Sequence, residues 1–340
     1  MALWVVRAGR RGEREGTALR ESCALIGFHE LGDLSDITER EQLRPILESA
    51  LPDRSAGAIA NYVGQLWAFK ERIQIGDLVA LPLHSTASIA FGRITGPYQY
   101  EETAPTDARH RRPVEWIRDD VPRTAFDRDL LFSLGGASTV FQVRRNDAES
   151  RITAVVSGGS SVEVPVPEAD TAETPEPTVD VEEYGRDQIR TLIDRRFAGH
   201  ALARLVDAVL RAKGYTTHLS PEGPDQGVDV LAGGGPMGLD QPRIAVQVKT
   251  GTVDSPTVSQ LQGAMDNFGA EQGLMVAWGG FRRGVEAEAR RRFFRLRLWD
   301  SDKLIDELTS VYERLPADLR DELPLTQVWA VVGDAATDEP

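Results

Sequence analysis

The 340-residue sequence has one cysteine, four lysines and no apolar run near the roughly 20 residues that a membrane-spanning helix needs. A single cysteine, Cys23, excludes an intramolecular disulfide and a zinc site built from several thiolates. In the first residues, MALWVVRAGRRGERE, the charges follow the short apolar stretch, which is not the order of a signal peptide. We therefore expect a protein of the reducing cytoplasm, without a membrane partner.

The sequence also lacks the motifs of several common enzyme classes. The five histidines show no spacing typical of metal ligands, and neither a Gly-x-Ser-x-Gly elbow nor a P-loop occurs. Gly233, Gly235 and Gly238 formally match a dinucleotide-binding pattern, but Pro236 and Pro242 leave no room for the helix that would bind phosphate. We interpret this glycine-rich stretch as a hairpin turn.

The formal net charge of -14 argues at first against a nucleic-acid partner. Phosphate contacts need only a local basic surface, however, and arginines gather in the stretches 7–14, 109–112 and 282–295. Each stretch taken alone is more typical of a solvated face. Composition therefore leaves the partner open.

Composition divides the chain into two domains of ordinary size. No lysine or arginine occurs between residues 152 and 185, where proline, threonine and acidic residues predominate. Such a stretch buries too little apolar surface to fold. We expect a first domain at 1–158, an acidic linker at 159–185, a second domain at 186–330 and an acidic tail at 331–340.

The two halves differ in the order of their predicted elements. Short strands and two helices predict a small, strongly bent sheet or barrel of the α+β kind in the first half, with strands near 3–8, 23–28, 73–83, 88–98, 112–117 and 139–143 and helices near 38–50 and 55–69. The second half alternates as α-β-β-α-β-α-β-α, which predicts a mixed sheet with helices on its faces.

Polar residues interrupt two apolar strands of the second half. In RIAVQVK (243–249), strand alternation places Gln247 and Lys249 on one face, and Asp229 interrupts the preceding strand GVDVL. Burying an unpaired ammonium costs several kcal/mol, so Lys249 needs a partner or a cleft. If the two strands form a hairpin, these three side chains converge.

The trio suits phosphodiester hydrolysis. The oxygens of Asp229 and Gln247, together with the main-chain carbonyl of Val248, are hard ligands for Mg²⁺ or Mn²⁺. A bound metal lowers the pKa of a water and offsets phosphate charge, while Lys249 orients or deprotonates that water. The alternative is a buried Asp–Lys pair with a structural purpose.

A family resemblance supports the catalytic interpretation. GPDQGVDVLA (223–232) followed by IAVQVK (244–249) resembles the Asp…Gln-x-Lys signature of the Mrr-type branch of PD-(D/E)xK restriction endonucleases, and GHALARLVDAVLRAKGY (199–215) resembles the helix before it. The similarity covers about residues 197–308. It implies that Asp229 and Gln247 bind metal, that Lys249 is catalytic and that Asp225 lies at the edge of the site.

The sequence departs from that family at one position. The family usually has a Phe-Glu pair in this helix, whose glutamate helps to bind metal, but Leu202 and Ala203 stand here. Three alternatives follow: Asp207 supplies the carboxylate, one metal suffices, or catalysis is weakened.

The first half resembles the PUA/EVE-like domains of modification-dependent restriction enzymes, through LWVVRAGRRGE, ALIGFHELGDLSD, WAFKERIQIGDLVALP, IAFGRITGPYQY and RRPVEWI. Such domains hold a flipped-out base in an aromatic pocket. The residues expected there are Phe28, His29, Asp33, Trp67, Tyr98, Tyr100 and Trp116, although core packing is the alternative for most of the aromatics. The arginines expected to contact DNA phosphates are Arg10, Arg11, Arg109, Arg111 and Arg112.

Together these patterns predict a modification-dependent DNA endonuclease of the phage-defence type that uses Mg²⁺. Its first domain would recognise a modified base, such as a modified cytosine, in double-stranded DNA, and its second would cut nearby. Two cuts need two active sites, which favours a homodimer. The rivals are a DNA-binding protein whose nuclease fold is weakened or inactive, and a repair or junction nuclease acting on unmodified DNA.

Overall fold

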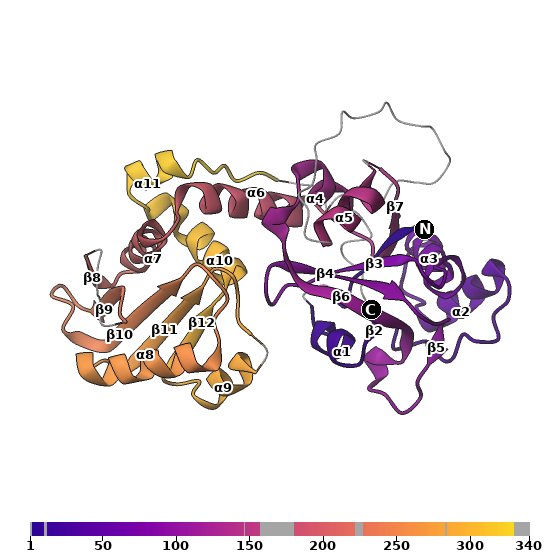
Figure 1. The fold of residues 1–340 in the computed structure, drawn as a ribbon, viewed down its shortest axis with the longest axis horizontal. Coiled ribbons are helices and arrows are strands. Elements are labelled where there is room, and N and C mark those ends of the chain that lie inside the picture. The colour runs from indigo at the N-terminus through magenta and orange to yellow at the C-terminus, as the bar shows by residue number, and fades with distance from the viewer. Residues whose placement is uncertain are drawn as a thin grey trace. The chain divides into compact units, whose positions relative to one another are not determined.

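A computed structural model describes residues 2–9, 12–145, 147–156, 180–221, 227–282 and 284–329, with only the backbone of Glu286. The chain forms two compact units that part between Tyr184 and Gly185, residues 85–87 being grouped with the second (Figure 1). Within the described ranges, no helix combines the length and the hydrophobicity required to cross a bilayer.

The first unit is built on a seven-stranded sheet whose order is β2-β6-β4-β3-β1-β7, with β5 paired to β6. Only β1 and β3 run parallel. β2 and β7 are the edge strands of this sheet and do not pair with each other. The described strands therefore form an open sheet, whereas the sequence left a closed barrel as one of two expectations. The strands are β1 (Leu3–Val6), β2 (Cys23–Ile26), β3 (Leu78–Pro82), β4 (Ser88–Ile94), β5 (Gln99–Tyr100), β6 (His110–Pro122) and β7 (Val140–Val143).

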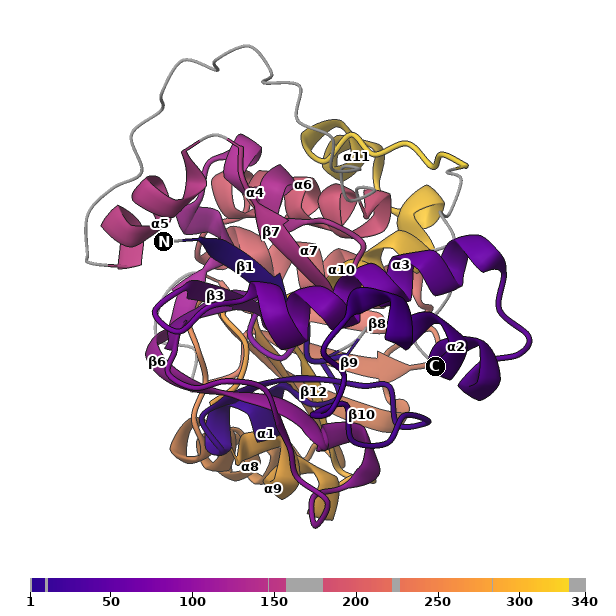
Figure 2. The ribbon, with the colours of Figure 1, turned by 90° about the vertical axis from the view of Figure 1, so that its right-hand side faces the viewer.

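Helices cover both faces of this sheet because β1 and β3 alternate apolar side chains between two cores. Trp4 and Val6 lie in the core that α2 and α3 cover, and Leu3 and Val5 lie in the core of α4 and α5. α2 and α3 lie side by side (Figure 2). The helices are α1 (Glu15–Arg20), α2 (Leu43–Ala50), α3 (Ala56–Trp67), which continues as a π-helical segment (Ala68–Arg72), α4 (Arg128–Leu134) and α5 (Ala148–Val156).

The second unit contains the predicted mixed sheet, in the order β12-β11-β10-β9-β8. β8, β9 and β10 are antiparallel neighbours, and β10, β11 and β12 run parallel. β8 was not among the predicted strands. The strands are β8 (Thr216–Leu219), β9 (Val230–Gly234), β10 (Asp240–Lys249), β11 (Gln272–Ala277) and β12 (Leu296–Trp299).

The helices of the second unit divide between the two faces of its sheet. α7 and α10 share a core with Val230 and Val246, and α8 and α9 share the other core with Ala245. α8 begins after Asp254, whose side chain accepts the Thr257 N–H and so caps the helix. The helices are α6 (Val181–Arg196), α7 (His200–Ala212), α8 (Ser255–Phe268), α9 (Val285–Arg291), α10 (Ser301–Val311) and α11 (Ala317–Glu322).

The predicted linker, residues 159–185, overlaps the start of α6. α6 begins at Val181, so residues 181–185 are helical, and the Glu183 N–H is capped by the Asp180 carboxylate. Acidic residues stabilise the first turn of a helix, so the same composition that predicts a linker also suits a helix start. The rest of the predicted linker up to residue 179, and the predicted tail, lie outside the described residues.

Candidate active site

β9 and β10 form the predicted hairpin and bring Asp229 beside Gln247. Val230 pairs with Val246, and the N–H of Asp229, just before β9, donates to the Val246 carbonyl at 2.9 Å. Asp229 and Val230 thus both face Val246, as in a β-bulge, and Asp229 lies just outside β9. One carboxylate oxygen of Asp229 accepts the Val248 N–H at 2.8 Å, which fixes the orientation of the carboxylate.

The side-chain oxygen of Gln247 is buried inside the second unit. The residue is 4% exposed, and among the described residues no donor reaches its side-chain Oε1. A buried acceptor without a partner costs about 1–3 kcal/mol. A hard cation next to the Asp229 carboxylate would satisfy this oxygen, so the donors fit the Mg²⁺ site that the sequence predicts.

Lys249 ends β10 with an exposed side chain on the same face as Gln247. Its main chain is held in the parallel ladder opposite Ala277, and its carbonyl accepts the Trp278 N–H at 2.8 Å. Within the described ranges its ammonium makes no ion pair. The exposed side chain of Lys249 does not fit the alternative of a buried Asp–Lys pair.

The backbone around the end of β10 is closely packed. The loops after β10 and β11 meet at a bridge between Val253 and Phe281, and the Thr252 hydroxyl donates to the Gly279 carbonyl at 3.0 Å. A Cβ at Gly279 would lie 2.7 Å from the carbonyl carbon of Gly251, closer than side chains approach. This packing gives Lys249 a rigid support.

Asp207 is held away from the Gln247 side chain. It belongs to α7, which packs on the Val246 face, whereas strand alternation assigns Gln247 to the opposite face of β10. Its Oδ2 pairs with Arg211 at 3.0 Å, and its Oδ1 is buried without a hydrogen bond from the described residues. Ala203, one helical turn earlier, is buried. The structure thus favours a single metal or weakened catalysis over substitution by Asp207.

The remaining donors are few. Asp225 lies outside the described residues, and within those ranges no group of three or more His, Cys, Asp or Glu side chains could hold a metal. One carboxylate, one amide oxygen and a main-chain carbonyl suit Mg²⁺, which usually keeps several waters. The Val248 carbonyl stays a predicted ligand.

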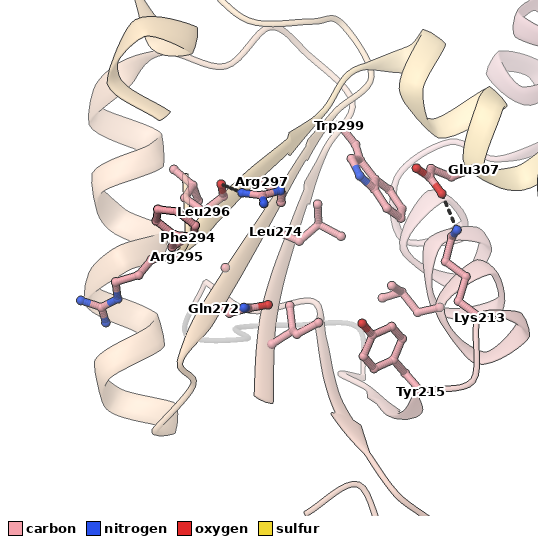
Figure 3. Close-up of a pocket in the computed structure, with 13 residues that line it drawn as sticks. Lys213, Tyr215, Gln272, Leu274, Phe294, Arg295, Leu296, Arg297, Trp299 and Glu307 are labelled. Carbon is pink, nitrogen blue, oxygen red and sulfur yellow. Dashed lines mark hydrogen bonds and ion pairs between the residues drawn. The ribbon is translucent and has the colours of Figure 1, made fainter. Parts of the chain in front are cut away.

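A separate pocket of about 280 Å³ opens at the other end of the sheet (Figure 3). Gln272, the first residue of β11, lines it, whereas Lys249 pairs with the last residue of that strand. Five residues of strand separate the two ends by roughly 16 Å. Tyr215, Trp299 and Arg297 also surround the pocket, while Arg295 points away from it. The pocket is distinct from the candidate active site.

The mixed sheet and the Asp229, Gln247 and Lys249 side chains fit the expected PD-(D/E)xK signature, and a comparison with protein families gives a match over the same part of the chain. Residues 194–308 match the Mrr catalytic family, described as a restriction endonuclease. This match covers most of the second unit, which is therefore similar in sequence to Mrr-type catalytic domains. Residues 4–130 match a domain of unknown function, DUF8426.

Two solved structures show distant similarity. The DNA modification-dependent restriction endonuclease AspBHI is 14% identical, with a TM-score of 0.32, over 73% of this chain and 67% of its own. The MspJI restriction endonuclease, solved in complex with a 27-mer oligonucleotide, is 14% identical, with a TM-score of 0.31, over 73% of this chain and 64% of its own. The chain thus spans about two thirds of each. No curated protein matches it.

Two of the aromatics predicted for a base pocket lie in the core of the first unit. Phe28 is 4% exposed and packs edge-on against Tyr62, with ring centroids 5.4 Å apart. Its φ of 61° is in the left-handed region, which a bulky residue rarely adopts. Trp67 packs against the same core. Both side chains therefore pack in the core, which was the alternative to a role in a base pocket.

A hydrogen-bonded pair of the half-buried Tyr98 and the buried His110 packs near Phe28. The Tyr98 hydroxyl is 2.8 Å from Nδ1 of His110 and accepts the Leu34 N–H at 3.4 Å, and the Tyr100 ring centroid is 5.2 Å from that of His110. His110 is fully buried. Burial raises the pKa of Tyr98 and lowers the pKa of His110. The sequence pattern alone indicates no role for His110.

The other predicted pocket residues make local contacts. The Trp116 indole N–H donates to the Ala18 carbonyl at 3.1 Å. His29 lies 3.1 Å from the Glu30 carboxylate, and the exposed Asp33 accepts the Ser35 N–H at 2.8 Å. The structure therefore brings Tyr98 and Tyr100 together and leaves His29 and Asp33 on the surface.

The arginines predicted to bind phosphates differ in exposure. Arg112 is 3% exposed and donates to three main-chain carbonyls, so its predicted contact with DNA is wrong. Arg111 donates to the Ala108 carbonyl and pairs with Glu21 at 3.0 Å. Arg109 is half-buried, and its Nε donates to a carbonyl 3.3 Å away. Arg10 and Arg11 lie outside the described residues.

The buried His110 predicts a pH dependence of stability. Its folded pKa is lowered, so the unfolded chain binds more protons below the unperturbed value near 6.5, and stability falls as the pH drops through this range. We expect the free energy of unfolding of wild type to decrease from pH 7 to 5 more steeply than that of His110→Gln. Urea unfolding at both pH values measures the difference; parallel profiles would contradict it.

Proposed function

We propose that the chain is a metal-dependent DNA endonuclease whose active site is formed by Asp229, Gln247 and Lys249. The observation that carries the proposal is the buried, unsatisfied Gln247 oxygen beside the fixed Asp229 carboxylate, two residues before an exposed lysine. The family match of residues 194–308 supports the same chemistry.

Asp229 and Gln247 would hold the metal ion, and Lys249 would act on the water and the phosphate. A bound Mg²⁺ or Mn²⁺ would supply a water of lowered pKa and offset charge on the scissile phosphate. The Val248 N–H holds the Asp229 carboxylate, and the hairpin holds the Gln247 oxygen beside it. The Lys249 ammonium stands at a rigid strand end, where it orients the attacking water and donates to a phosphate oxygen.

The proposal extends to the first unit, which would select the substrate. The half-buried rings of Tyr98 and Tyr100, which His110 supports from the interior, would stack on a flipped base. The substrate would be double-stranded DNA with a modified cytosine, cut in the cytoplasm as phage defence. A homodimer would supply the two sites that a double-strand cut needs.

Digestion of matched duplexes tests the proposal. Plain, methylated and hydroxymethylated duplexes are incubated with the full chain and Mg²⁺. We expect cleavage of a modified duplex, little cleavage of the plain one and none by Asp229→Ala. Equal cleavage of the plain, methylated and hydroxymethylated duplexes by the wild-type chain would favour a repair nuclease. Absence of cleavage with either Mg²⁺ or Mn²⁺ would favour an inactive binding protein.

A further inference from the structure

Exposed arginines and phenylalanines gather along α9 and the turn that follows it. Residues 282–297 contain seven arginines and two glutamates, a net charge of +5 in a chain of net charge -14. Phe293 and Phe294 are 54% and 85% exposed, with ring centroids 5.4 Å apart. We call Arg282, Arg290, Arg291, Phe293 and Phe294 the arginine strip.

Local structure does not account for this strip. Val285 and Ala289 anchor α9 in the core, which leaves Arg290 and Arg291 on the solvent side. Arg282, Arg290 and Arg291 form no ion pair within the part of the chain that the structure describes. Cations do stabilise the last turn of a helix, but that effect explains neither Arg282, before α9 begins, nor the exposure of Phe294.

The neighbouring arginines show the contrast. Arg292 pairs with Glu288 at 3.0 Å, and the Arg297 guanidinium lies 3.8 Å over the Phe293 ring. Arg295 approaches Asp266 only at 3.8 Å, both being exposed, a pair of little energetic value. The three arginines of the strip, by contrast, form no such pair within the described residues.

The strip starts at the edge of the candidate active site. The Arg282 N–H donates to the Val253 carbonyl at 2.8 Å, and Val253 follows Lys249 by only four residues. α9 runs from this edge to Arg290 and Arg291. Its seven residues give it a length of about 9 Å. A polyanion held at Lys249 could continue along it.

We infer that the arginine strip is a DNA-backbone surface of the nuclease unit, an inference that rests on the proposed function. Arg282, Arg290 and Arg291 would contact successive phosphates, and Phe294 would pack against the sugars or bases beside them. Guanidinium groups suit phosphate oxygens, and an aromatic ring suits any base or sugar without regard to sequence. The strip would thus supply affinity and leave base selection to the first unit.

Salt-dependent DNA binding tests the inference. The full chain carrying Asp229→Ala, which prevents cleavage, is titrated with a labelled duplex at several salt concentrations. Adding Arg290→Gln and Arg291→Gln should lower affinity about tenfold and reduce the slope of log affinity against log salt by about two. Lysine at both positions should restore the slope. Phe294→Ala should weaken binding about fivefold and leave the slope unchanged.

The control is Arg314→Gln, an exposed arginine of the same unit, which should change neither quantity. If the double glutamine variant binds like this control, the strip is not a DNA surface, and an acidic protein becomes its better partner. If the Asp229→Ala chain binds no duplex and wild type cuts none, the proposed function itself has failed. The two failures are therefore distinguishable.

Discussion

Replacing Lys249 by alanine is expected to slow DNA cleavage by about a thousandfold or more. The side chain is exposed at the end of a rigid strand and has no structural partner among the described residues, so its loss should remove the group that orients the water and disturb little else. Single-turnover cleavage measures the effect. Duplex binding and the free energy of unfolding should stay close to those of wild type.

Lys303→Ala is the matched control for this prediction. Lys303 is exposed, belongs to the same unit and pairs with Glu307 at 2.8 Å on α10. We expect its variant to cleave at the wild-type rate. Equal rates for Lys249→Ala and Lys303→Ala would show that the signature lysine takes no part in the reaction.

Replacing Gln247 by leucine is expected to stabilise the metal-free protein and to abolish its stabilisation by metal. The substitution removes a buried oxygen without a hydrogen-bond donor and keeps a similar volume, so the free energy of unfolding should rise by about 1–3 kcal/mol. Thermal unfolding with and without Mg²⁺ measures both effects. Gln247→Glu keeps an oxygen ligand and should keep the stabilisation by metal.

Gln65→Leu provides the contrasting case. Gln65 is also buried, but its Oε1 accepts the Val140 N–H at 3.1 Å. Leucine there leaves a buried donor without a partner and should destabilise the protein by about 1–3 kcal/mol. If Gln247→Leu destabilises the protein as Gln65→Leu does, the oxygen of Gln247 is satisfied without metal and the site has been misassigned.

The second unit could be predicted well because its sequence patterns have one physical solution. Alternation in RIAVQVK separates two apolar faces, and a short glycine-rich turn can only return the chain as a hairpin. That hairpin brings the Asp229 carboxylate to the Val248 N–H, next to Gln247. The sequence could not predict that the Gln247 oxygen lacks a donor, because this depends on every neighbour in the folded state.

The first unit shows where local patterns mislead. RHRR looks like a basic surface, yet His110, Arg112 and Val114 are all buried on one face of β6. The alternation typical of a β-strand was present in the sequence, but the prediction of a basic surface gave more weight to the charge of these residues. A guanidinium can be buried where main-chain carbonyls accept hydrogen bonds from it, as the carbonyl of Gly96 does from Arg112. Sequence alone does not reveal such carbonyls.

Calorimetric titration of the metal tests the central claim most directly. Mg²⁺ and Mn²⁺ are added in turn to the full-length wild type and to Asp229→Ala, without DNA. The account predicts saturable binding of at least one ion by wild type and its loss in the variant, because Asp229 supplies the carboxylate that joins the Gln247 oxygen. Identical titrations for the two proteins would contradict it.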